Sequence, residues 1–88
     1  MFELGSVAVS SRASEVVNMF NIDILLRRHL EIDDDTNGSN RAINMNTVRQ
    51  GFGSIINIFN IGDKRVYIHT VHQLGGGAYT RIYLSDEY

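Results

Sequence analysis

Two segments near the C-terminus, 65–71 and 79–84, alternate between mainly aliphatic and mainly aromatic or basic side chains. This pattern constrains the fold more than any other feature, because side chains alternate across a β-strand and the sheet then has two chemically different faces. We expect helices to cover the aliphatic face, which holds Val66, Ile68, Ile82 and Leu84. Burying each of these side chains is worth about 1.5–3 kcal/mol, whereas burying an unpaired arginine costs several.

The opposite face is predicted to carry rings and cations, brought together if the two strands pair through the Gly75-Gly76-Gly77 turn. The candidate partner-binding residues are Arg65, Tyr67, His69, Tyr79, Arg81 and Tyr83. Three interpretations stay open. The side chains form solvated cross-strand pairs worth about 0.2–1 kcal/mol each, or they bind a protein through the residue types common in interface hot spots, or they stack nucleobases.

The rest of the chain predicts a short strand over 2–9, helices over 12–20 and 22–30, and a weaker third helix between Ala42 and Gly51. A strand around 55–59 then turns at Gly62-Asp63-Lys64 into the first of the two alternating segments. The predicted fold is α+β, with two to three helices packed on one face of a three-stranded antiparallel meander.

With 88 residues the chain is expected to form a single domain, 1–88. It has no apolar run of the roughly 20 residues that cross a membrane, and its first residues do not read as a secretory signal. We therefore expect a cytoplasmic protein without membrane contact. The sequence has no cysteine, which excludes disulfides and Cys-based metal sites.

The formal net charge is −2, with eight basic and ten acidic residues. This balance argues against binding long stretches of duplex DNA and also against a heavily acidic DNA mimic.

The segment from Asp33 to Gly38 satisfies the first half of a calcium-binding EF-hand loop. The second half fails, because Asn44 stands where a bidentate glutamate belongs and Arg41 is a cation beside the expected cation site. A solvated acidic turn is the preferred interpretation, with calcium binding as the alternative.

No other motif predicts an enzyme, a cofactor or a metal. His69 and His72 are three apart in a predicted strand, so their side chains point to opposite faces and cannot share a metal. His29 fits a helix-end cation or a partly buried hydrogen bonder better than a general base.

Four short segments, in order along nearly the whole chain, carry a family resemblance. They are Phe2-x-Leu4-Gly5 followed by Ser10 and Ala13, Leu26-x-Arg28-His29, Asn44-x-x-x-x-Arg49-Gln50-Gly51-Phe52, and Thr80-x-Ile82-x-Leu84-x-Asp86-Glu87-Tyr88. Together they resemble a family of small bacterial proteins labelled plasmid-related or hypothetical. This chain departs from the family at Ile32-Asp33-Asp34-Asp35, where the family runs Gly-Asp-Trp-Gly, and at Ser85, where it has proline. The resemblance implies a setting on mobile genetic elements and no particular chemistry.

We therefore expect a non-enzymatic accessory protein of a plasmid, integrative element or phage that binds another protein, such as an inhibitor of a host defence nuclease of the anti-restriction or anti-CRISPR type. The alternative is a small nucleic-acid-binding regulator that uses the same tyrosine and arginine face. An exposed first or last strand could also pair with its own copy, so a homodimer is compatible with the sequence.

Overall fold

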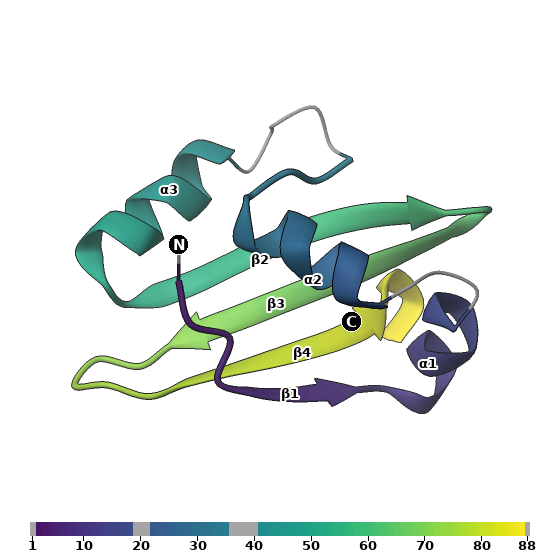
Figure 1. Cartoon of the computed structure of the whole chain (residues 1–88), viewed down its shortest axis with the longest axis horizontal. Coiled ribbons are helices and arrows are strands. Elements are labelled where there is room, and N and C mark those ends of the chain that lie inside the picture. The colour runs from purple at the N-terminus through teal and green to yellow at the C-terminus, as the bar shows by residue number, and fades with distance from the viewer. Residues whose placement is uncertain (1, 19–21, 36–40, 88) are drawn as a thin grey trace.

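The computed structural model describes residues 2–18, 22–35 and 41–87. Within them, the α-helices lie on one face of a mixed four-stranded sheet (Figure 1). The elements are β1 (Ser6–Val9), α1 (Ser11–Val17), α2 (Ile22–Leu30), α3 (Arg41–Gln50), β2 (Gly53–Ile61), β3 (Lys64–His72), β4 (Ala78–Leu84) and the 3-10 helix η1 (Ser85–Glu87). The predicted α+β class and the antiparallel meander of β2, β3 and β4 are confirmed. Residues 19 and 20 of the first predicted helix lie outside the described residues.

The N-terminal strand is shorter than predicted and extends the meander into a sheet of order β1-β4-β3-β2, with β1 parallel to β4. The prediction that this strand begins at Phe2 is wrong, because the chain turns at Gly5, whose φ is +64°. A Cβ atom on Gly5 would overlap the carbonyl group of Ala78, so only glycine lets the backbones approach this closely. The last strand, β4, lies inside the sheet and has no free edge for a second copy. The first strand, β1, lies at an edge, and its pairing with a second copy stays a prediction.

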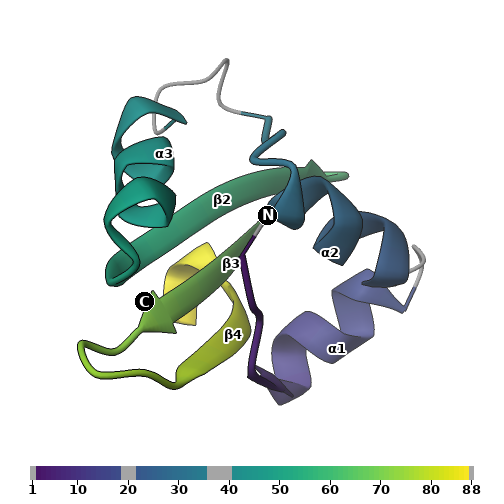
Figure 2. The same ribbon diagram turned by 60° about the vertical axis from the view of Figure 1, so that its left-hand side comes forward.

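The predicted burial of the aliphatic sheet face is confirmed. Helices α1 and α2 lie next to each other on the same side of the sheet (Figure 2). Helix α1 contributes Ala13 and Val17 and helix α2 contributes Leu25 to one buried cluster with the sheet. The buried strand residues in this cluster are Phe59, Ile61, Val66, Ile68, Ile82 and Leu84. At about 1.5–3 kcal/mol for each large side chain, this cluster is the main source of stability.

A second buried cluster joins Phe2, Ile32 and Ile55. Ile32 follows the end of α2 with a φ of +53°, the left-handed conformation that a β-branched residue rarely adopts. Its N–H donates to the carbonyl of His29, and the N–H of Asp33 donates to the carbonyl of Arg28. This pair of hydrogen bonds is typical of a helix C-terminus at which glycine usually occupies the position of Ile32. Burial of the Ile32 side chain offsets the strain of its backbone.

Side chains of α3 cover the outer edge of β2. The amide of Asn44 donates to the carbonyl of Ile56 at 2.8 Å and accepts from the N–H of the same residue at 3.1 Å. The hydroxyl of Thr47 donates to the carbonyl of Ser54 at 2.9 Å. Residues that are mediocre helix formers thus occupy the buried side of α3, because an edge strand needs polar partners for its backbone.

The acidic segment after α2 covers the rest of this edge. Asp34 accepts a hydrogen bond from the N–H of Ile58 at 3.1 Å, and the second carboxylate oxygen of Asp35 accepts from the N–H of Asn60 at 2.8 Å. The backbone N–H of Asp35 donates to the carbonyl of Ile58 at 2.8 Å. Two of the three consecutive aspartates therefore close the sheet edge.

Candidate functional site

The face of the sheet turned away from the α-helices, which we call the open face, holds all six candidate residues. Tyr67 lies directly opposite Tyr83 on the neighbouring strand, and His69 lies directly opposite Arg81. Arg65 and Tyr79 lie at the two ends of this row, since alternate residues of a strand share a face. The strand pairing that the alternation predicted therefore brings the six side chains onto one surface.

The centre of the open face is the ring pair of Tyr67 and Tyr83, whose centroids are 5.6 Å apart at an interplanar angle of 40°. The guanidinium carbon of Arg81 lies 5.6 Å from the centroid of the Tyr83 ring. Aromatic pairs and cation–ring contacts at such distances each contribute about 0.5–1.5 kcal/mol. The interactions preorganise the face rather than leaving each side chain free in solvent.

Tyr83, predicted to be one of the partner-binding residues, is largely covered. It lies on the open face but is only 7% exposed, whereas Tyr79 is 40% exposed. Strand β3 contacts η1, the turn of helix that follows β4, so the chain folds back near this part of the sheet. Tyr83 supports the face, and Arg65, Tyr79 and Arg81 are its exposed members.

A hollow of about 280 Å³ opens beside the ring pair, lined by His69, Arg81, Tyr83 and Glu87. The Nε2 atom of His69 is closed to solvent and has no hydrogen-bond partner within the described part of the chain. Burial, and to a smaller extent the charge of Arg81, lower the pKa of His69. The carboxylate of Glu87 at the rim accepts hydrogen bonds from the N–H of Leu84 at 2.8 Å and from the hydroxyl of Ser10 at 2.7 Å.

Strand β2 adds an apolar border that the sequence analysis missed. Ile58 pairs with Tyr67 and Ile56 pairs with His69, so both isoleucines lie on the open face, where they are half-buried. The alternation of β2 did not reveal them, since isoleucines occur on both of its faces.

On the helix side, His29 is fully buried in a directional chain of hydrogen bonds. The hydroxyl of Thr80 donates to the carbonyl of Leu4 at 2.7 Å, so it must accept from Thr70, also at 2.7 Å. Thr70 then accepts from Nε2 of His29 at 2.8 Å, and the Nδ1 atom accepts from the amide of Asn57 at 2.7 Å. The imidazole is therefore neutral, and its burial, helped by His69, lowers its pKa to about 4. We interpret these hydrogen bonds as structural.

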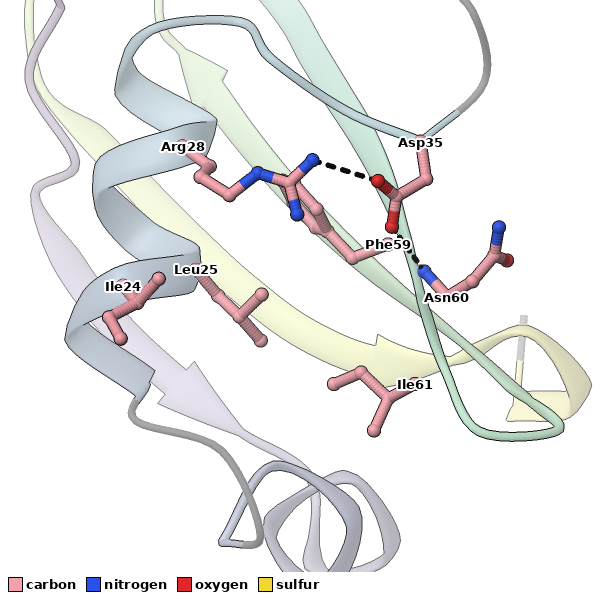
Figure 3. A pocket seen from close by; sticks show the side chains of 7 residues that line it. All are labelled: Ile24, Leu25, Arg28, Asp35, Phe59, Asn60 and Ile61. Carbon is pink, nitrogen blue, oxygen red and sulfur yellow. Dashed lines mark hydrogen bonds and ion pairs between the residues drawn. The ribbon is translucent and has the colours of Figure 1, made fainter.

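A second hollow, of about 140 Å³, lies between α2 and the end of β2 (Figure 3). Its floor is the ring of Phe59, with the guanidinium carbon of Arg28 at 4.8 Å from the ring centroid. Arg28 donates to Asp35 at 2.8 Å, and Asp35 in turn accepts from the backbone of Asn60. This ion pair and its hydrogen bonds belong to the architecture of the sheet edge.

These contacts also bear on the calcium alternative. Asp34 and Asp35 direct carboxylate oxygens at backbone N–H groups, and Asp33 lies 3.4 Å from the guanidinium of Arg28. The acidic segment is thus a support of the sheet edge and not simply a solvated turn. Residues 36–40 of the EF-hand-like pattern lie outside the described residues. Among the residues described, no three His, Asp or Glu side chains form a group that could hold a metal.

His72 lies on the opposite face from His69, as the strand spacing predicts, and its Nε2 atom donates to the carbonyl of Glu3 at 2.8 Å.

Comparisons with family models, curated proteins and solved structures found no match to this chain. In the described ranges, none of the helices is long and apolar enough to cross a membrane.

Proposed function

We propose that this chain is a non-enzymatic protein that acts by binding another protein through its open face. The observation that carries the proposal is the tilted pair of Tyr67 and Tyr83 with Arg81 beside it, on the sheet face away from the helices. Tyrosine and arginine are the residues that most often dominate binding energy at protein interfaces. Because the rings are already packed together, little conformational freedom is lost when a partner docks.

The resemblance to plasmid-related proteins favours a role on a mobile genetic element, in the cytoplasm of its bacterial host. An inhibitor of a host defence nuclease, of the anti-restriction or anti-CRISPR type, fits a small chain that presents one preorganised face. The seclusion of His29 in the core supports a binding role over a catalytic one, since a general base must reach its substrate.

The second candidate is a nucleic-acid-binding regulator, favoured by the presence of Arg65 and Arg81 on the same face as the rings. The net charge of −2 weighs against it. Salt separates the two candidates, because nucleic-acid affinity falls steeply with salt concentration, whereas a complex centred on tyrosines changes far less.

The test is affinity capture from host lysate with matched variants. The double variant Arg65→Ala/Tyr79→Ala removes exposed side chains of the open face, and Ile43→Ala/Met45→Ala removes exposed side chains of α3. We expect the first variant to lose the captured protein and the second to retain it. Equal capture by both variants, or captured nucleic acid in place of protein, contradicts the proposal.

A further inference from the structure

The open face is cationic, although the protein as a whole is acidic. Its strand residues from β2, β3 and β4 include two arginines and one histidine and no aspartate or glutamate. Arg65 and Arg81 form no ion pair with any other described residue, whereas Arg12 and Arg28 both do. Unpaired guanidinium groups on a binding face call for an anionic group on the partner.

His69 supplies a second, independent feature at the same place. A buried polar atom without a hydrogen bond destabilises a protein, and native proteins rarely contain one. The Nε2 atom of His69 is such an atom, in a side chain that faces the hollow beside Arg81. A ligand oxygen that reached Nε2 as the exposed Arg81 side chain turned toward it would remove this destabilisation.

We propose that the hollow receives a carboxylate from the protein partner, the side chain of an aspartate or glutamate, gripped by Arg81 and hydrogen-bonded by His69. This inference rests on the function proposed above and specifies which chemical group of the partner enters the hollow. The guanidinium offers a planar fork that matches the two carboxylate oxygens. The ring of Tyr83, 5.6 Å from the guanidinium carbon, orients that fork.

The charges around the hollow favour a carboxylate over a phosphate. One guanidinium faces the hollow, and the carboxylate of Glu87 lines its rim. A carboxylate brings a single negative charge, so it meets less repulsion from Glu87 than a phosphate group with two charges would.

Docking of a carboxylate is coupled to a proton on His69. The charged groups around this imidazole are Arg81 from β4 and Glu87 from η1, while His29 of α2, buried across the sheet, interacts with it electrostatically. Burial and Arg81 hold the pKa of His69 low in the free protein. A bound carboxylate places a negative charge beside the imidazole, so it favours the imidazolium, and binding becomes tighter as the pH falls.

The test uses the purified chain and sodium acetate as the carboxylate probe. The His69 ring signals are followed by NMR across pH, with ionic strength and the concentration of ionised acetate held constant at each pH. We expect acetate in place of chloride to raise the titration midpoint of His69 by about half a pH unit, which corresponds to about threefold tighter binding to the protonated form. Arg81→Gln should abolish the shift. Arg65→Gln, with the same change of charge on the same face, should retain it.

Three outcomes overturn the inference: no response to acetate, a response to inorganic phosphate at least as large, or equal loss in Arg65→Gln and Arg81→Gln. A larger response to phosphate assigns the hollow to a phosphate-bearing ligand instead. Because Arg81 is exposed, its variant is expected to fold, and backbone amide spectra verify this. If acetate does not shift the His69 titration while capture from lysate still depends on Arg65 and Tyr79, the proposal of a bound carboxylate is wrong. The proposed protein-binding function is then retained.

Discussion

Asn57 donates a hydrogen bond from its side-chain amide to Nδ1 of His29 across 2.7 Å, with both residues fully buried. The same amide group also donates to the carbonyl of His29, and its oxygen accepts from Asn44 at 3.3 Å. Rotating the Asn57 amide to meet a protonated Nδ1 would break both of these bonds. The contact therefore admits only the neutral imidazole.

This relationship predicts that the protein loses stability in mild acid. The pKa of His29 is about 4 in the folded protein and about 6.5 in the unfolded chain. The folded state therefore binds fewer protons, so the stabilisation is complete above pH 6.5 and is lost as the pH falls toward 4. The full loss is about 3 kcal/mol. Urea unfolding at several pH values measures it.

The control for this prediction is His29→Gln, which cannot titrate. The variant should lose most of the pH dependence between 6.5 and 4. The smaller contributions of half-buried His69 and, near pH 4, of the carboxyl groups of Asp35 and Glu87 should remain, all of the same sign. An equal slope in the two proteins, or a His29 NMR titration near pH 6.5, would contradict the assignment.

Asn44→Ala should destabilise the fold by about 2–3 kcal/mol, because it removes both side-chain bonds to Ile56 and leaves the β2 edge open. Asn46→Ala is the matched control, since Asn46 is exposed on the same helix and should change stability by less than about 0.5 kcal/mol. Chemical denaturation measures both, and light scattering should detect self-association of the Asn44 variant alone.

Gly5→Ala should lower the melting temperature much more than Gly62→Ala. Both glycines have positive φ, +64° and +61°, so each substitution costs about 1–2 kcal/mol of backbone strain. Only at Gly5 does the new Cβ atom also overlap the backbone of Ala78, while at Gly62 nothing lies within 4 Å. We expect a fall of roughly 4–8 °C per kcal/mol. Similar melting temperatures for the two variants would show that the close approach at Gly5 is not needed.

Tyr83→Ala should cost about 3 kcal/mol or more, whereas Tyr79→Ala should cost less than about 1 kcal/mol. The difference follows from exposure, since Tyr83 is 7% exposed and Tyr79 is 40% exposed. Tyr83 is therefore unsuitable for testing the interface by truncation to alanine. Equilibrium unfolding of both variants checks this, and equal losses would mean that the open face does not divide into support and contact residues as described.

The sequence by itself determined the two-faced ribbon of β3 and β4. Strict alternation has a period of two, so Ile68 and Tyr67 must lie on opposite faces in any sheet, and pairing through the triglycine turn sets Tyr67 beside Tyr83. The second helix, from Ile22 to Leu30, also follows from local spacing alone.

Only the tertiary structure decided where isolated polar residues belong. The sequence alone identifies Asn44 only as a poor helix former, and Asp34 and Asp35 only as two acidic residues. Their hydrogen bonds to the backbone of the β2 edge form with residues distant in sequence. The parallel pairing of β1 with β4 and the burial of Tyr83 likewise depend on long-range contacts. Local periodicity specifies which side of an element is apolar, but the hydrogen-bond partners of buried polar groups are set by the assembled fold.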